Sequence, residues 1–234
     1  MSDNRTETLY IRRKRRRKVA AIISTICASL LTILIVIALN IFYVDGFTIS
    51  VSKESQLFLT VDETREIITT ELNIPQGIKA TDAQYSDIPD NIDDELGSKI
   101  TNNYFAYTFY LGSNSTVNYS LSMTLNRVSN DLDDAMRVMI IRNSERTVYA
   151  KANDDGTPKL IYHGENHNNP DEILGTTKSF KDNKHIILEP YSINKDGYDK
   201  YTIVMWIDGW ESNNLMKGGV FHSDVKFSTI SNNN

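Results

Sequence analysis

The stretch Val117-Asn-Tyr-Ser-Leu-Ser-Met-Thr-Leu-Asn126 has the most regular pattern in this chain of 234 residues. Every second side chain in it is apolar, and the side chains between them are polar. Alternation with a period of two predicts a β-strand that buries one face and exposes the other to water. The preceding segment Tyr104–Leu111 is rich in aromatic residues, which favour strands. We expect Gly112–Ser115 to join these two strands as a hairpin loop.

Further strand patterns follow toward the C-terminus, separated by turn-forming residues at Asn143–Glu145 and Asn153–Pro158. Tyr198–Ile207 is apolar on both faces, which predicts a central strand of a sheet. The other predicted strands are Met136–Ile141, Arg146–Ala150, Lys159–Tyr162, Gly175–Phe180, His185–Leu188 and Gly219–Thr229.

Helical patterns are sparse in the same region. Val61–Asn73 predicts one helix with Asp62 as its N-cap, and Asn130–Asp134 predicts a single turn. The polar and acidic segment Tyr85–Asn103 predicts a long loop, within an excursion at about 80–103. Short strands at regular spacing, without β-α-β alternation, predict a mainly β domain, namely an antiparallel β-sandwich.

The N-terminal part of the chain has a different character. Val19–Val44 contains no charged residue, and 26 helical residues would extend roughly 39 Å, which is enough to cross a bilayer. We therefore expect a basic cytoplasmic tail at 1–18, a transmembrane signal anchor at 19–44 and an external domain at 45–234. The basic residues that set this orientation, and that also suit anionic lipid headgroups, are Arg12, Arg13, Lys14, Arg15, Arg16, Arg17 and Lys18.

A cleaved signal peptide is the alternative for this segment. The apolar run is longer than a signal peptide needs, and Ala38-Leu-Asn40 is a poor cleavage site, so a retained anchor is the better interpretation. The expected location is thus the plasma membrane, crossed once, with the N-terminus in the cytoplasm and the C-terminus outside.

Charge and cysteine content restrict the function further. The first 18 residues carry eight basic and two acidic side chains, whereas the rest of the chain carries 17 basic and 28 acidic side chains. An acidic body repels phosphates, which argues against nucleic acid as a partner. Cys27 is the single cysteine and lies in the predicted span, so the external domain must be stable without disulfides.

The chain resembles the camelysin/TasA family of surface proteins of Gram-positive bacteria. The resemblance is carried by a span that leads into a strand-prone segment, by Tyr104–Leu125, and by Met205-Trp-Ile-Asp-Gly-Trp-Glu211 followed by Gly218-Gly219 and a strand ending at Phe227. It implies a jelly-roll β-sandwich at the cell surface, and several members of the family build biofilm matrix fibres. Those fibres need a cleaved N-terminus for strand exchange, so the resemblance implies the fold more than it implies fibres.

Metal ligands are the main candidates for a chemical site. His163, Glu165 and His167 have the i, i+2, i+4 spacing that places side chains on one face of a strand, which is suitable for Zn²⁺. Members of the similar family have been described as metalloproteases. The segment lacks H-E-x-x-H and is rich in Asn, Gly and Pro, so a solvated loop is the stronger interpretation.

Oxygen ligands for Ca²⁺ are also present, but their spacing is not that of an EF-hand. Turn formation and a soluble acidic surface explain them better; they are Asn153–Gly156, Asp82, Asp87, Asp90, Asp93 and Asp94.

Other candidates have simpler explanations. Trp206 and Trp210 could stack on a sugar ring, although such tryptophans more often lie in a core. His185 and His222 fall in predicted strands, where a single histidine is usually structural. The sequence has neither a G-x-S-x-G motif nor an external cysteine, so no catalytic residue is predicted.

These observations favour a membrane-anchored cell-surface protein whose ectodomain is not an enzyme and acts in adhesion, matrix or envelope scaffolding. Its expected partners are membrane lipids, at the span and the basic tail, and proteins or further copies of the chain, at sheet edges or loops. A metal-dependent envelope hydrolase is the first alternative. An extracytoplasmic ligand-binding or sensor module is the second.

Overall fold

The computed structural model describes residues 19, 22–29, 42–44, 47–53, 55–74, 78–159 and 176–230. The chain divides into one unit up to Ile41 and a second unit from Phe42 to Asn234. In the first unit residues 22–29 are helical, and the Ser29 hydroxyl donates to the carbonyl of Ile26 at 2.8 Å. No helix within the described part of the chain is both long enough and apolar enough to cross a membrane. The basic residues 12–18 and the predicted span from 30 to 41 lie outside the described residues, whereas Phe42–Val44, the predicted end of the span, form a strand paired in the second unit and not a helix.

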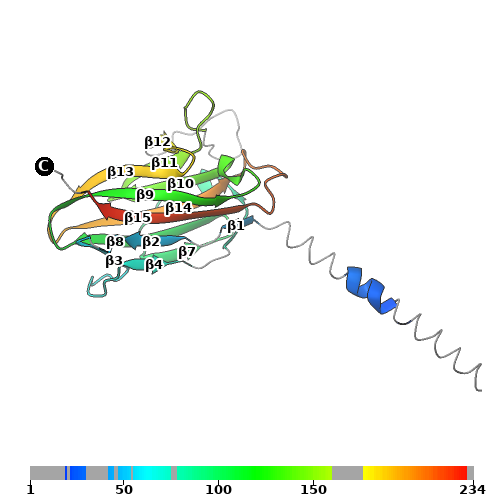
Figure 1. The fold of residues 1–234 in the computed structure, drawn as a ribbon, viewed down its shortest axis with the longest axis horizontal. Coiled ribbons are helices and arrows are strands. Elements are labelled where there is room, and N and C mark those ends of the chain that lie inside the picture. The colour runs from blue at the N-terminus through cyan, green and yellow to red at the C-terminus, as the bar shows by residue number, and fades with distance from the viewer. Residues whose placement is uncertain are drawn as a thin grey trace, which may run out of the picture. The chain divides into compact units, whose positions relative to one another are not determined.

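The second unit is mainly β, as the sequence predicts, and its described residues form two sheets (Figure 1). The first sheet has seven strands: β1 (Phe42–Val44), β2 (Thr48–Val51), β4 (Glu71–Asn73), β5 (Ile78–Ala80), β9 (Val117–Val128), β13 (His185–Ile193) and β15 (Val220–Thr229).

The second sheet has eight strands within the same described ranges. They are β3 (Leu57–Thr60), β6 (Asp82–Ala83), β7 (Gly97–Ile100), β8 (Tyr104–Ser113), β10 (Met136–Arg142), β11 (Glu145–Ala150), β12 (Thr176–Ser179) and β14 (Tyr198–Asp208). Two short 3₁₀ turns accompany them, η1 (Tyr85–Asp87) and η2 (Leu132–Asp134).

Both sheets are mixed, which corrects the prediction of a purely antiparallel arrangement. The long central pairs, β9 with β13 and β15 and β14 with β8 and β10, are antiparallel. Among the described strands four pairs are parallel: β1 with β15, β2 with β15, β11 with β12, and β14 with β6. Each of these pairs contains a strand of only two to four residues. Such short strands have too few residues for an alternating pattern to be recognised in the sequence.

The two sheets share one core. The ring of Phe227 in the first sheet lies 5.1 Å from that of Tyr201 and 6.0 Å from that of Phe109, both in the second sheet. Phe47 and Phe105 make a similar edge-to-face contact at 5.1 Å. The alternating apolar residues of the opening stretch belong to this core, and Tyr119, Leu121 and Met123 are almost completely buried.

A second, smaller core lies on the other face of the second sheet. The polar-looking excursion after β6 supplies Tyr85, Ile88 and Ile92, which pack with Trp206 and Val204 of β14. Both faces of β14 are therefore buried, and β14 lies between β10 and β8, so the prediction of a central strand is confirmed. The excursion also contains β7, so it is not wholly a loop.

The predicted hairpin at Gly112–Ser115 is wrong. β8 pairs with β14, β3 and β7, whereas β9 pairs with β13 and β15, so the connection crosses from one sheet to the other. The side chains on both faces of β8 are buried, so β8 belongs to the second sheet, which has a core on each face. In β9 buried and more exposed side chains alternate, so β9 belongs to the first sheet, which is covered on one face.

The predicted helix at Val61–Asn73 is also wrong, because this segment is a loop followed by β4. The Asp62 carboxylate accepts hydrogen bonds from the amides of Thr64, Glu66 and Ile67 at 3.0–3.2 Å, as a capping residue does, but no helix follows. Leu59 and Thr69 exchange two backbone hydrogen bonds of 2.8 Å across the loop. Four consecutive β-branched residues at 67–70 favour this extended pairing over a helix.

Candidate functional site

One end of the domain holds a pocket and a buried ion pair; we call it the entry end, and we define it by Phe42, Asp208 and Val220. β1 runs parallel to β15 with Tyr43 opposite Val220, so the chain enters the domain beside the start of β15. β14 ends at Asp208, whose amide donates to the carbonyl of Ala135 just before β10. Figure 1 shows the β14–β15 connection and β1 at this same end.

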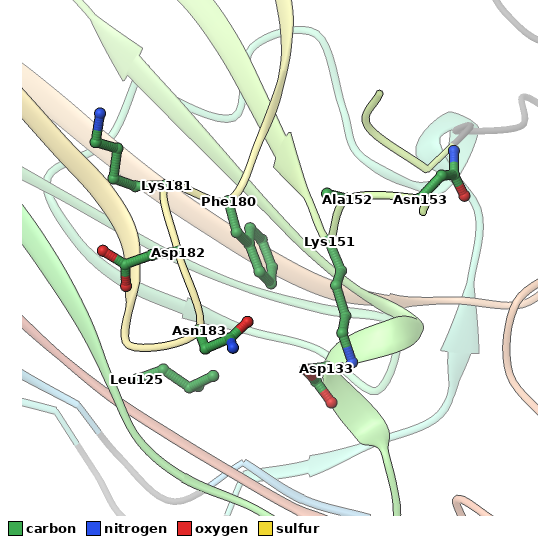
Figure 2. Close-up of a pocket in the computed structure, with 9 residues that line it drawn as sticks. All are labelled: Leu125, Asp133, Lys151, Ala152, Asn153, Phe180, Lys181, Asp182 and Asn183. Atoms are coloured by element: carbon green, nitrogen blue, oxygen red, sulfur yellow. Dashed lines mark ion pairs between the residues drawn. The ribbon is translucent and has the colours of Figure 1, made fainter. Parts of the chain in front are cut away.

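A pocket of about 580 Å³ opens near the entry end (Figure 2). It is built by β9, by η2, by the segment after β11 and by the turn between β12 and β13. The lining residues are Leu125, Asp133, Lys151, Ala152, Asn153, Phe180, Lys181, Asp182 and Asn183. Leu125 stands opposite Ser223 of β15, and Lys151 follows Ala150, which pairs with Arg137, so these elements all reach toward the entry end.

The pocket has an apolar floor and a polar wall. Leu125 and Phe180 are half-buried and pack against the main core. Figure 2 shows the Phe180 ring and the Asn183 amide turned toward the middle of the pocket, with the Lys151 chain running along the opposite wall to Asp133. An apolar ring beside amide donors and acceptors is suited to a ligand with one apolar and one hydroxylated face.

Two lysines neutralise the acidic groups beside the pocket. The Lys151 ammonium lies 2.8 Å from Asp133 and 2.6 Å from Asp134. The Lys159 ammonium lies 3.1 Å from Asp134 and 3.6 Å from Glu211, and a second hollow of about 620 Å³ adjoins this group. Burial alone would raise the pKa of Asp134, but the hydrogen bonds from the two lysines outweigh it, and the net shift is downward.

A buried ion pair supports the same end from within the domain. Arg137 Nε lies 3.8 Å from Asp208 Oδ2, and both side chains are about 1% exposed or less. The Arg137 guanidinium also donates to the carbonyl of Asp134 at 2.8 Å, and Asp208 Oδ1 accepts from the amide of Trp210 at 3.0 Å. Burial raises the pKa of Asp208, against the opposing effect of Arg137.

A second polar network joins β9 and β13 of the first sheet to β10 and β14 of the second. The Tyr119 hydroxyl donates to Asp199 Oδ2 at 2.6 Å and contacts the Tyr201 hydroxyl at 2.7 Å. Arg142 Nη2 donates to Asp199 at 3.0 Å, and its guanidinium stacks 4.5 Å above the ring of Tyr191. Burial raises the pKa of Tyr119 well above its usual value.

The residues predicted as zinc ligands, His163, Glu165 and His167, lie outside the described residues, as do the basic residues 12–18. Asn153–Gly156 forms the predicted turn, in which Asp155 Oδ1 accepts from the amide and hydroxyl of Thr157. Within the described ranges, no group of three His, Cys, Asp or Glu side chains comes together in a way that suits a metal ion. The Asp90 carboxylate lies 3.8 Å from Arg146.

The remaining candidates are explained by the structure. Trp206 is 1% exposed in the second core, while Trp210 is 38% exposed, so the two do not form one sugar-stacking surface. His185 begins β13, and its Nδ1 lies 3.0 Å from Oδ2 of Asp182 in the turn before that strand. The backbone amides of Lys184 and His185, together with the His185 ring, lower the pKa of Asp182 to about 2.

Sequence reasoning missed the pocket itself. Its residues come from four segments between Leu125 and Asn183, and each is ordinary in its local context. The one local signal was Phe180, an apolar residue at the end of a weak strand and next to a polar turn.

Comparison of the chain with protein-family models, with curated proteins and with solved structures finds no match.

Proposed function

We propose that this chain is a single-pass cell-surface protein, anchored by the apolar residues 19–41 that precede β1, whose ectodomain is a non-enzymatic scaffold of the cell envelope. The uncharged run of 26 residues and the basic cluster before it support the anchor and its orientation. The two sheets around a shared core support a jelly-roll-like sandwich, as in the camelysin/TasA family that the sequence resembles.

The observation that carries the scaffold proposal is that the pocket opens at the entry end. If residues 19–41 cross the bilayer, covalent continuity at Phe42 brings this end of the domain close to the membrane. A ligand in the pocket then lies in the layer directly above the lipid headgroups. This position favours a component of the same cell's envelope as the ligand over a molecule on another cell. The Phe180 ring and the Asn183 amide suit a neutral sugar unit of an envelope polymer.

The outer edge of β13 is poorly suited to pairing with the strand of a partner protein. Ile230 donates to the carbonyl of Asn118, so Asn118 and Ser120 direct their backbone groups toward β15. Pro190 stands opposite Ser120, and its nitrogen therefore faces the outer edge of β13, where it removes a donor. Contacts with partners accordingly fall on the pocket and loops.

The first experiment is the N-terminal sequence and mass of the mature protein taken from its native envelope. An intact N-terminus at full mass, with resistance to carbonate extraction, is the expected result. A new N-terminus near Asn40–Phe47 would contradict the anchor and favour a released subunit.

The second experiment tests the pocket with Phe180→Ala and Asn183→Ala in the full chain. Both should weaken retention of the protein on purified cell-wall polymer, while Ile67→Ser, in the exposed β3–β4 loop, serves as the matched control. Equal retention of all three variants would reject the pocket as the contact.

A further inference from the structure

The connection between β14 and β15 presents large apolar side chains to solvent on a well-fixed loop. Leu215 is 85% exposed and Trp210 is 38% exposed, whereas Met216 between them and β15 is buried at 4%. Backbone bonds from Ser212 to Asp208 and from Gly219 to Met216, at 3.0 and 2.8 Å, close the loop at both ends. The loop is thus built to keep these two side chains outward while its own base is packed.

The base of this loop is tied to the buried ion pair. Asp208 Oδ1 accepts from the amides of Trp210 and Glu211 at 3.0 and 3.4 Å, and Asp208 itself pairs with Arg137. Cβ atoms at Gly219 would lie 2.7 Å from the carbonyl oxygen of Met216, so the loop returns tightly against its own backbone. Such bracing holds Trp210 and Leu215 at a defined place relative to the sheets.

The loop lies where the chain enters the domain. Tyr43 of β1 pairs with Val220, the first residue of β15, so the apolar run 19–41 continues through β1 to the point at which the loop ends. If that run crosses the bilayer, as the proposed function states, covalent continuity brings the loop to the membrane surface. Tryptophan is enriched at this interface because its ring is apolar and its N–H is polar.

We propose that Trp210 and Leu215 insert into the outer leaflet of the same bilayer that anchors the chain, and that the loop seats the ectodomain on the membrane. The charges of the loop agree with this. Glu211 is paired with Lys159 at 3.6 Å, and the exposed Lys217 adds a cation for phosphate headgroups.

A second exposed apolar loop provides a natural comparison. Ile67 and Ile68 are 75% and 55% exposed in the loop between β3 and β4. Arg65 of that loop stacks over Tyr198, which begins β14, while Trp210 follows the end of β14. The 11 residues of β14 separate the two loops by roughly 33 Å at about 3.3 Å per residue, and Figure 1 shows them at opposite ends.

The test uses the full chain reconstituted into vesicles of phosphatidylcholine and phosphatidylglycerol, with bromine on the phosphatidylcholine acyl chains. Trp206 and Trp210 are the two tryptophans of the chain, and Trp206 is buried. We expect bromine to quench the emission of the wild type, and Trp210→Phe to remove this loss while Trp206 emission persists. The matched control W210F/I67W places an exposed tryptophan at the opposite end and should not be quenched.

Flotation of the vesicles separates the two proposals. A chain that floats but whose Trp210 is not quenched overturns the seating of the loop and leaves the anchor intact. Equal quenching at positions 67 and 210 also overturns it. If Trp210 is instead shielded at high protein density and its emission does not respond to brominated lipid, the loop contacts a second copy of the chain. That result would also overturn the proposal. A chain that does not float overturns both.

Discussion

Asp208 is the residue on which several parts of the entry end depend. Its carboxylate faces Arg137 inside the domain and accepts from the amides that begin the β14–β15 loop. Removing one partner of a buried pair leaves an uncompensated charge, whereas replacing both by apolar residues is much less costly.

Asp208→Ala should therefore lower the free energy of unfolding by roughly 3–5 kcal/mol. The double variant R137M/D208L should recover most of that loss, because it leaves no buried charge. Urea unfolding followed by circular dichroism measures both. A loss below about 1 kcal/mol in the single variant would show that the pair carries little stability.

Glu189 makes stability sensitive to acid. Its carboxylate accepts from Lys178 and Tyr191, each at 2.6 Å, and from Tyr149 at 2.9 Å. Burial acts to raise its pKa, but these three bonds outweigh burial and place the pKa below the ordinary 4.5. A carboxylate of this kind contributes stability above pH 4.5, and that stability is lost as the pH falls through the lowered value.

Glu189→Gln should consequently destabilise the domain at neutral pH and have a flatter stability profile below about pH 4.5 than the wild type. Urea midpoints measured from neutral pH down to pH 3 provide the comparison. Parallel profiles for the two proteins would show that another carboxylate controls the acid response.

At the scale of elements, β13 is the edge strand of the first sheet among the described strands, and it shows how such an edge is protected. Pro190 directs its nitrogen to the outer side, so the ladder with β9 keeps its bonds while the free edge loses a donor. Pro190→Val restores that donor and raises the strand propensity. We expect this variant to self-associate with rising concentration, as measured by light scattering, while Ser192→Val, on the same edge, should stay like the wild type.

Prediction of elements from the sequence succeeded where a pattern extends over many residues. The alternation at Val117–Asn126 and the doubly apolar Tyr198–Ile207 correspond to β9 and β14. The β10–β11 hairpin also agrees, since Asn143 and Ser144 both adopt positive φ in its turn. Partners of strands could not be predicted, because the choice of sheet for β8 and β9 depends on contacts that local spacing does not record.

The pocket illustrates the same limit. Lys151, Phe180 and Asn183 become neighbours only through the pairing of β11 with β12 and of β9 with β13. Asp62 shows the opposite case, in which a correct capping residue was identified but long-range pairing of Leu59 with Thr69 replaced the helix.

At the scale of the whole domain, the shared core makes the two sheets depend on one another. Phe109 of the second sheet lies 5.7 Å from Tyr201 and 6.0 Å from Phe227, the latter in the first sheet. Phe109→Ala should cost roughly 3–5 kcal/mol, because it opens a cavity between the sheets. Trp206 fluorescence and amide exchange in β9 should report the same reduced stability; different values would mean that the sheets unfold separately.

The direction of β1 determines how the domain responds to a mechanical pull. If residues 19–41 anchor the chain as proposed, tension between the anchor and a contact at the opposite end would enter at Phe42 and act along β1, which bonds to β15 on one side and β5 on the other. The bonds to antiparallel β5 are perpendicular to the strand and those to parallel β15 are slanted across it, so a pull along β1 loads the bonds together rather than one by one. If this three-residue strand yields, the strain passes to Phe47 and Ile49, both buried in the core, so the domain can lengthen slightly under force before its core is disturbed.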